Sequence, residues 1–327
     1  MKTRITALAL LLCLCLTACG EDGDGGGQPS LLETASGLEE TTVLLTIDGR
    51  EVPAWRYLYW LAYTCDQIAE QYAAAELSLD WDTALSGGST LADSAKEQAL
   101  ADTALYATVE NWAETYGCAP AETAESGESP LPDLGLEPER MEALAQVGRQ
   151  YAALRQRAAE SGSDLAPTAE ELAAYGREIG AVTLDRILVS AGEDREAARQ
   201  RAEALFSQLN GAADPAATFS ALAAEGDDPA GPRTVFPEEG TLDETLLAAV
   251  QALEEGQTSG ILESDEGFSI LRRLPLDTAA LEERCFDHRL ESTAAQAAVT
   301  VTPAYETLDP AAFWDALSRA RNAEDPA

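Results

Sequence analysis

The pattern of apolar residues between positions 182 and 274 constrains the fold more than any other feature of this sequence. Two runs rich in β-branched and aliphatic residues frame it, and helical patterns fill the space between them. The strand-like runs are Val182–Val189 and Gly267–Leu274, and the helical patterns are Arg195–Leu209, a short piece around Phe219, and Leu242–Leu253. Strands and helices that alternate over roughly 90 residues predict one small α+β domain.

The N-terminus combines positive charge with a short apolar run. Lys2 and Arg4 precede an apolar stretch from Ile5 to Leu16, which is shorter than the about 20 residues that span a bilayer. This pattern predicts a secretory signal peptide and not a transmembrane helix. The segment Leu16–Gly20 resembles the lipobox of bacterial lipoproteins, which implies that Cys19 is lipidated and becomes the first mature residue. An ordinary signal peptide with a chance cysteine is the alternative.

Residues 19–40 are rich in Gly, Asp, Glu and Ser and contain the triplet Gly25–Gly27. A segment of this composition cannot bury a core, so we expect a flexible tether. Two or more acyl chains are enough for stable anchoring. We therefore expect an extracytoplasmic protein that is anchored to the bacterial cell membrane by the lipid on Cys19.

Acidic residues dominate the charge of the chain. Lys and Arg number 21 and Asp and Glu number 58, which gives a net charge of −37. Such a charge argues against nucleic acid as a partner, and we expect most of the carboxylates on solvated helix faces. The sequence has no EF-hand spacing, P-loop, nucleophile elbow, HExxH or dinucleotide-binding glycine pattern. We expect neither a metal nor a cofactor.

Four cysteines follow the signal sequence, namely Cys19, Cys65, Cys118 and Cys285. The absence of a CxxC pair argues against a zinc ribbon or a thioredoxin-type redox site. Cys65 and Cys118 fall in one predicted helical region, and an extracytoplasmic setting permits a disulfide. A Cys65–Cys118 disulfide and two free buried thiols both remain open, because sequence does not give the geometry.

Helical patterns precede the central domain and follow a predicted strand at Thr42–Ile47. They begin at Pro53, extend over Leu91–Gly117 and Glu137–Ala159, and start again at the capping box Thr168–Glu171, with a loop at Glu125–Gly135. The first of these helices has an apolar face rich in aromatic residues. That face is either core or a surface that holds unfolded polypeptides.

The central domain resembles the parvulin-type peptidyl-prolyl isomerases in the order and spacing of its motifs. The matching motifs are Thr183–Val189, Thr218–Glu225 with Asp227 and Asp228 just after it, Ala249–Gly256, and Gly267–Ile270. The resemblance implies an α+β fold and the catalysis of prolyl cis–trans isomerisation.

Two departures from the family concern the centre of the site. Parvulins usually carry two histidines on the floor of the sheet, and here Arg186 and Ser269 stand at those positions. The only histidine, His288, lies outside the domain. A buried arginine needs a carboxylate partner, for which Asp227 and Asp228 are the candidates.

The proline pocket of the family departs from its usual pattern as well. Leu242 and Leu246 occupy the positions of its Met and first Phe, and the second Phe falls near Val250. Phe236 ends a reduced version of the family's glycine-rich turn and is the fourth expected pocket residue. Isomerisation is rotation about an amide bond with a barrier of about 18–20 kcal/mol and needs no covalent intermediate. The resemblance therefore leaves both an active isomerase and an inactive binding domain open.

The flanking segments resemble the chaperone region of PrsA-type and SurA-type foldases. The phrase Leu45–Pro53, followed by an aromatic-rich helix, carries that likeness. After the central domain we expect a helix at Asp277–Ala297, a strand at Ala298–Pro303 and a final helix at Asp309–Arg319. The resemblance implies that Val299–Val301 pairs with Val43–Ile47 to complete the helical region.

We therefore expect a mainly helical, discontinuous chaperone domain with an inserted parvulin-like α+β domain. The predicted segments are a signal peptide (1–18), a tether (19–40), helical parts (41–180 and 277–320), the parvulin-like domain (181–276) and a tail (321–327). The expected function is that of a lipid-anchored folding factor for unfolded or newly secreted polypeptides. The alternatives are an active prolyl isomerase and a non-catalytic scaffold for one folded partner.

Overall fold

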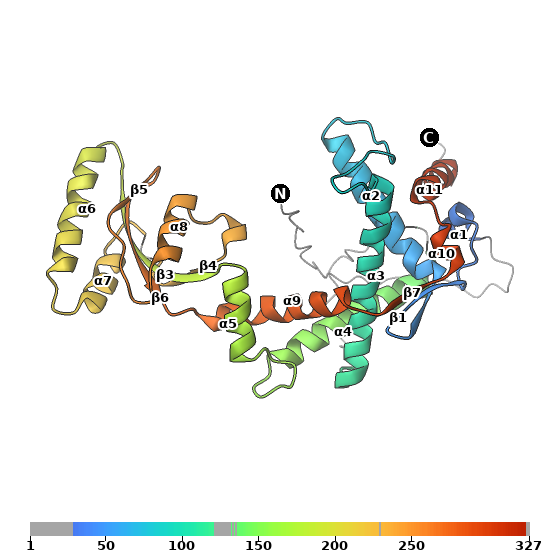
Figure 1. Ribbon diagram of the computed structural model, residues 1–327, viewed down its shortest axis with the longest axis horizontal. Helices are drawn as coiled ribbons and strands as arrows, with labels where there is room; N and C mark the ends of the chain where they lie inside the picture. The colour runs from blue at the N-terminus through green and yellow to red at the C-terminus, as the bar shows by residue number, and fades with distance from the viewer. Residues whose placement is uncertain (1–28, 121–131, 133, 135, 229, 325–327) are drawn as a thin grey trace. The chain divides into compact units, whose positions relative to one another are not determined.

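Two compact units make up the chain in the computed structural model. The structure describes residues 29–120, 132, 134, 136–228 and 230–324. The helical unit comprises Met1–Leu165 and Asp287–Ala327, and the α+β unit comprises Ala166–Phe286. The predicted α+β class, with a mainly helical part, is confirmed (Figure 1). The signal peptide, Cys19 and most of the predicted loop at 125–135 lie outside the described residues.

Long helices form most of the helical unit. They are α2 (Ala54–Ala74), α3 (Leu91–Tyr116), α4 (Pro138–Ala158) and α11 (Pro310–Glu324), with the short α1 (Leu31–Ser36) and α10 (Pro303–Glu306); α9 (Glu282–Ala295) crosses the boundary between the units. A capping box of Thr90 and Asp93 starts α3, and Gly117 ends it in the left-handed conformation. Within the described residues, no helix is both long enough and apolar enough to cross a membrane.

A three-stranded sheet joins the two ends of the helical unit, in the order β2-β1-β7. A tight turn at Asp48–Gly49, both with positive φ, connects β1 (Val43–Ile47) to β2 (Arg50–Pro53). The third strand, β7 (Val299–Val301), pairs antiparallel with β1. The pairing predicted from the sequence is therefore confirmed.

The predicted tether extends too far into the chain. Residues 31–36 form α1, whose N-cap Ser30 accepts a hydrogen bond from the Glu33 amide. Leu32 is fully buried, and α1 packs against α11 and α2. The polar composition of residues 19–40 hid this short helix, because a single buried leucine with a capping serine is enough to hold it once α11 is present.

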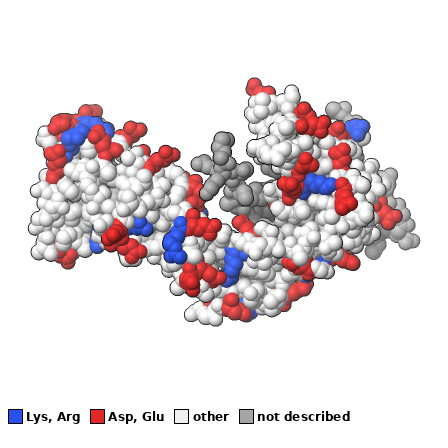
Figure 2. Space-filling view, in the orientation of Figure 1, with Lys and Arg blue, Asp and Glu red and all other residues white. Residues whose placement is uncertain are grey.

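The aromatic face of α2 is core along the first half of the helix. Trp55, Leu58 and Cys65 expose at most 6% of their surface. The second half of α2 is largely exposed. Figure 2 shows carboxylates spread over the visible faces of both units, as expected for solvated helix surfaces.

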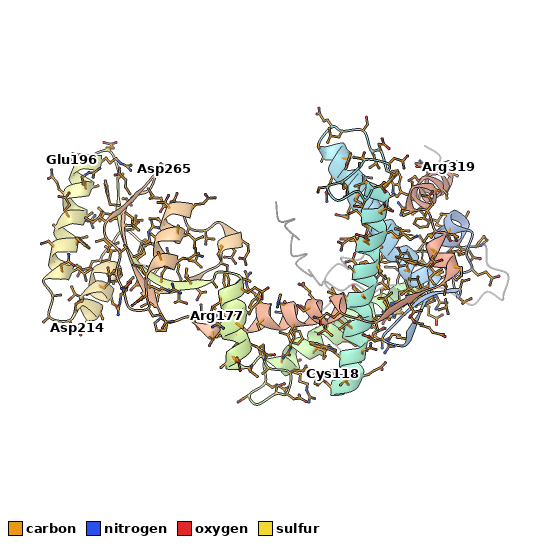
Figure 3. The ribbon with its side chains drawn as sticks, in the orientation of Figure 1. Cys118, Arg177, Glu196, Asp214, Asp265 and Arg319 are labelled. Atoms are coloured by element: carbon orange, nitrogen blue, oxygen red, sulfur yellow. The ribbon has the colours of Figure 1, made fainter. Side chains whose placement is uncertain are left out.

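Cys65 and Cys118 are free thiols, so of the two alternatives the disulfide is wrong. Cys65 is buried in the middle of α2, where burial raises the pKa of its thiol to about 12. Cys118 lies just beyond the C-terminal end of α3 (Figure 3). Cys118 is partly exposed, whereas Cys65 is buried.

The α+β unit is built on a four-stranded antiparallel sheet in the order β4-β3-β6-β5. The strands are β3 (Val182–Ser190), β4 (Arg233–Val235), β5 (Leu262–Ser264) and β6 (Gly267–Leu274), and the helices are α5 (Ala169–Glu178), α6 (Arg195–Asn210), α7 (Pro215–Ala224) and α8 (Glu244–Ala252). The central pair, β3 and β6, runs in register from Thr183↔Leu274 to Ser190↔Gly267.

Alternating side chains of β3 and β6 build one apolar cluster on each face of the sheet. One face holds Val182, Leu184 and Leu271 against Leu246 and Val250 of α8. The other face packs against α6 and α7 through Ile187, Leu209, Phe219, Leu222 and Ile270. Figure 1 shows α8 on one side of this sheet and α6 with α7 on the other.

Helix α5 belongs to the α+β unit, which corrects the boundary predicted at residue 180. Leu172 of α5 packs in a cluster with Ala181, Phe236, Leu281 and Cys285. The prediction placed the boundary where the strand pattern begins, and a strand pattern carries no information about which helices pack beside it. The α+β unit continues to Phe286, and Leu281 and Cys285 in this last segment pack in the same cluster as Leu172.

Asp102 on α3 has a carboxyl whose burial makes the stability of the helical unit depend on pH. Burial raises the pKa of its carboxyl to about 6, and a hydrogen bond from Gln98 opposes that shift. A carboxyl whose folded pKa is raised adds stability below its unfolded pKa, and this contribution is lost as the pH rises through about 6.

We expect Asp102→Asn to raise the free energy of unfolding at pH 7 by about 2 kcal/mol and to leave it unchanged at pH 4. Tryptophan fluorescence during urea denaturation measures this, because the chain's 5 tryptophans all lie in the helical unit. The control is Glu97→Gln, an exposed change on the same helix. A loss of stability at pH 7 in Asp102→Asn contradicts the prediction.

Candidate functional site

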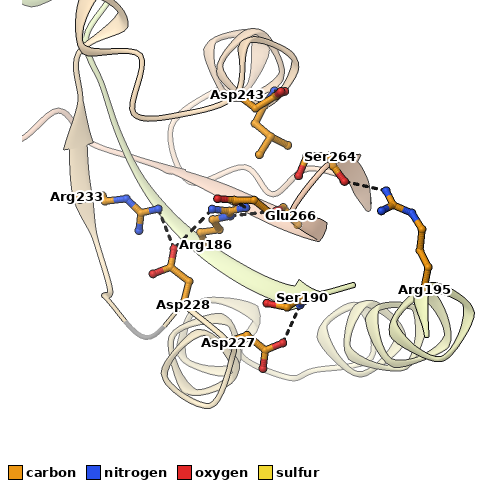
Figure 4. A network of polar contacts seen from close by, with 11 residues as sticks. Arg186, Ser190, Arg195, Asp227, Asp228, Arg233, Asp243, Ser264 and Glu266 are labelled. Carbon is orange, nitrogen blue, oxygen red and sulfur yellow. Dashed lines mark hydrogen bonds and ion pairs between the residues drawn. The ribbon is translucent and has the colours of Figure 1, made fainter. Parts of the chain in front are cut away.

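A buried arginine occupies the centre of the α+β unit. Arg186 of β3 is only 5% exposed. Its Nε donates to Ser269 Oγ at 3.0 Å, and its Nη2 donates to Glu266 Oε2 at 2.5 Å. Its Nη1 lies 3.7 Å from Asp228 Oδ2 (Figure 4). Three neighbours thus share the donors of one guanidinium group.

The register of β3 and β6 explains why Arg186 meets Ser269. Leu188 pairs with Ser269 and Arg186 pairs with Leu271, so the positions of Arg186 and Ser269 are diagonal neighbours on one face. Glu266 stands in the β5–β6 hairpin immediately before Gly267. An added Cβ at Gly267 meets Val189 O at 2.2 Å, so only glycine allows the hairpin this close to β3.

Asp228 joins Arg186 to a second arginine. Its Oδ2 accepts a hydrogen bond from Arg233 Nη2 at 2.9 Å. The hypothesis that a carboxylate neutralises Arg186 is confirmed for Asp228, while Glu266 makes the closer contact. Sequence reasoning missed Glu266, although its place one residue before the β6 glycine was the signal that could have found it.

Asp227 lies in a different set of contacts. Its carboxylate accepts the Ser190 amide at 2.7 Å and an Arg201 Nη1 hydrogen bond at 3.1 Å. The amide of Ser190 is the main cause that holds the pKa of Asp227 below its usual range, and Arg201 adds to it. Asp227 therefore ties the end of β3 to α6 and does not reach Arg186.

Asp185 is a buried carboxyl beside the network. It is 2% exposed and accepts the Arg186 amide at 2.9 Å. Burial raises the pKa of Asp185, and the positive charges of Arg272 and Arg233 oppose that effect. Sequence reasoning gave this residue no role.

The structure brings together three of the four predicted pocket residues. Leu242, Leu246 and Val250 pack in the cluster on the Arg186 face of the sheet and expose 7% or less. Phe236 lies instead in the cluster around α5, with Leu281 and Cys285. The guanidinium of Arg284 covers its ring at 4.0 Å. These side chains are packed as core, so the prediction that they hold a proline ring stays a prediction.

The chemistry available at this network differs from that of a histidine pair. A guanidinium group is always protonated and has no acceptor, so it cannot take up a proton. Its donors already face Ser269, Glu266 and Asp228. Within the described ranges, no cluster of three or more His, Cys, Asp or Glu side chains could hold a metal ion. The guanidinium of Arg186 is a buried, paired charge and does not itself act as a general acid or base.

Comparisons with known proteins fit the α+β unit. Residues 168–274 match the family model described as the PPIC-type PPIASE domain. The parvulin resemblance predicted from the sequence is confirmed for this part of the chain, and the match begins at the N-cap of α5. No curated protein matches the chain.

Several solved structures of folding factors are similar to the chain at low identity. PrsA from Bacillus subtilis is 15% identical, with 88% of this chain and 94% of that chain covered and a TM-score of 0.26. The foldase protein PrsA from Streptococcus pneumoniae is 15% identical, with 81% and 84% covered and a TM-score of 0.27. A structure of SurA-like chaperones from Campylobacter jejuni is 11% identical, with 78% and 93% covered and a TM-score of 0.24.

Arg186→Ala is expected to destabilise the α+β unit by about 2–3 kcal/mol, because it removes the hydrogen bonds that the buried guanidinium donates to Ser269 and Glu266. Hydrogen–deuterium exchange measures the effect as faster exchange of the β3 and β6 amides. Arg201→Ala is the control, since its exposed ion pair with Asp227 is worth at most about 1 kcal/mol. Unchanged protection of β3 in Arg186→Ala contradicts the prediction.

Proposed function

We propose that this chain is an extracytoplasmic folding factor that binds unfolded secreted polypeptides. Its PPIC-type domain binds and supports these polypeptides but does not catalyse prolyl isomerisation. The observation that supports the absence of catalysis is the Arg186 network. Where the family usually has two histidines, a permanently charged side chain is held by Ser269, Glu266 and Asp228.

Prolyl isomerisation needs a surface that favours the twisted amide over the planar one. The family does this with an apolar pocket beside a polar floor. Here the corresponding apolar side chains, Leu242, Leu246 and Val250, pack against one another and the sheet. In the polar floor, Arg186 pairs with Asp228 and Glu266 of the same domain, so both parts of the site make contacts within the domain.

Binding of unfolded chains fits the charge and the composition of the protein. A net charge of −37 keeps such a protein soluble while it holds an aggregation-prone partner. The lipobox-like segment at Leu16–Gly20 supports anchoring through Cys19 on the outer side of a bacterial membrane.

An active prolyl isomerase is the second candidate function. The observation that favours it is the match of residues 168–274 to the PPIC-type family model. The reaction needs no covalent intermediate, and Ser269 Oγ could still donate a hydrogen bond. The two candidates differ in one measurable quantity, the rate of amide rotation.

We expect the mature chain to leave the isomerisation rate of a proline tetrapeptide at its uncatalysed value and to suppress aggregation of several unrelated unfolded proteins. Arg186→Ala and Arg201→Ala serve as the matched pair for the peptide assay. Acceleration that Arg186→Ala abolishes and Arg201→Ala keeps establishes the isomerase instead. Protection of only one protein among many points to a scaffold for one partner.

Cys19→Ser is expected to abolish incorporation of radiolabelled palmitate and to move the protein from the membrane fraction to the soluble fraction. The physical reason is that acyl chains provide the membrane affinity. Expression in a bacterium followed by fractionation measures both. Cys118→Ser, which changes a free thiol outside the lipobox, is the control and should stay with the membrane. Palmitate labelling that persists in Cys19→Ser excludes this anchor.

A further inference from the structure

Glu266 is an exposed carboxylate that pairs with a buried guanidinium. Its Oε2 accepts a hydrogen bond from Arg186 Nη2 at 2.5 Å, and the side chains of Glu266 and Arg186 are 64% and 6% exposed. An ion pair with one partner in solvent is weak, because water screens the charge and the pair costs side-chain freedom. Glu266 is therefore the partner that Arg186 can most readily exchange.

The backbone of Glu266 is held independently of its side chain. Glu266 O accepts a hydrogen bond from the Ala191 amide at 3.0 Å, and the next residue, Gly267, leaves no room for a side chain beside Val189 O. The hairpin between β5 and β6 thus stays attached to the end of β3 when the Glu266 side chain rotates away. Such a rotation leaves Arg186 Nη2 without an acceptor (Figure 4).

The network around Arg186 is neutral only while Glu266 belongs to it. Arg186 and Arg233 carry one positive charge each. Asp228 Oδ2 lies 2.9 Å from Arg233 Nη2 and 3.7 Å from Arg186 Nη1, and it balances one of these charges. Glu266 balances the other. One carboxylate from outside the chain restores neutrality when Glu266 leaves, and a guanidinium group matches a carboxylate in shape and charge.

Two buried polar atoms on the Arg186 face of the sheet have no partner among the described residues, namely Arg233 Nη1 and Ser264 Oγ. Arg233 is on this face because it pairs with Leu184, which alternation places on the same side of β3 as Arg186. Ser264 is two positions after Leu262, which packs against the apolar cluster of this face. Because buried polar groups nearly always find a partner, these two atoms favour a ligand that accepts hydrogen bonds.

The charge of the chain limits how acidic that ligand can be. The net charge is −37, and Asp265 stands next to Glu266 in the same exposed hairpin. Repulsion between like charges disfavours ligands with many negative charges. A single carboxylate among uncharged groups reaches Arg186 with little of this repulsion.

We propose that Arg186 binds a single carboxylate of a client polypeptide, which takes the place of Glu266. Arg186 Nη2 donates to the carboxylate of the client, and the Glu266 side chain moves into solvent. An acidic side chain and the C-terminal end of a chain are the two sources of this group. The inference rests on the proposed function and names the chemical group that the PPIC-type domain recognises.

The test follows the side-chain Nε–Hε signal of Arg186 by NMR in the isotope-labelled mature chain. Three probe peptides are titrated: acetyl-Gly-Ser-Glu-Ser-Gly-amide, the same peptide with Gln in place of Glu, and the Gln peptide with a free C-terminal carboxylate. The Glu peptide should shift the Arg186 signal to saturation, whereas the amidated Gln peptide should leave it in place. A shift with the free-carboxylate peptide supports the proposal and adds the chain end as a source.

Glu266→Gln should bind the Glu peptide about three- to fivefold more tightly, because the variant removes a weak internal competitor for Arg186. The matched control is Asp265→Asn, which makes the same change of charge at the neighbouring exposed position. Its affinity for the Glu peptide should stay close to that of the unchanged chain. An equal gain in both variants means that general repulsion and not exchange with Glu266 limits binding, and it overturns the proposal.

Two further results overturn the proposal. One is an Arg186 signal that no peptide moves, in the unchanged chain and in Glu266→Gln alike. The other is an equal shift with the Glu peptide and the amidated Gln peptide. Suppression of aggregation by the unchanged chain tests the proposed function separately. If suppression persists while the Arg186 signal stays in place, only the carboxylate site is wrong; if suppression is absent while the signal responds, the proposed function is wrong.

Discussion

The antiparallel pairing of β3 with β6 is the contact on which the α+β unit depends. It covers all of β6 and all of β3 except Val182. Because side chains alternate along a strand, this one register decides which residues face α8 and which face α6 and α7. A shift by one residue would turn Leu184 and Ile187 to the wrong sides and would separate Arg186 from Ser269. The apolar clusters and the polar network therefore share one cause.

The buried guanidinium of Arg186 shows how the centre of this sheet accommodates a permanent charge. A charge in that position requires carboxylates, and Asp228 and Glu266 supply them from two different loops. Arg233 then balances Asp228. The result is a connected set of hydrogen bonds and ion pairs among Arg186, Ser269, Glu266, Asp228 and Arg233. Fold membership and catalytic competence are separate properties of this domain.

Buried polar groups in this chain differ in how fully they are paired. In the α+β unit the donors of Arg186 face acceptors of the domain itself. In the helical unit the donors of Trp60 and Thr64 face none among the described residues. Buried polar groups cost free energy unless they are paired, so the pairing of Arg186 within its own domain accounts for the burial of its charge.

Much of the fold followed from the sequence, since local patterns report local structure. The period of the apolar residues predicted β3, β6 and most helices, and the resemblance implied the pairing of Val299–Val301 with β1, which the structure confirms. The motif order also placed Arg186 and Ser269 at matching positions. These features depend on residues near one another in the chain or on a family pattern.

What only the tertiary structure decided concerns contacts between distant segments. Composition gave no sign that Leu32 is buried against α11, that α5 packs with Phe236, or that Cys65 and Cys118 stay apart. The closer partner of Arg186, Glu266, comes from a hairpin 80 positions away. Nor can a sequence show that donors on α2 lack acceptors, because satisfaction is a property of all neighbours in space. The sequence determined the elements and the family; the packing decided which polar groups are paired.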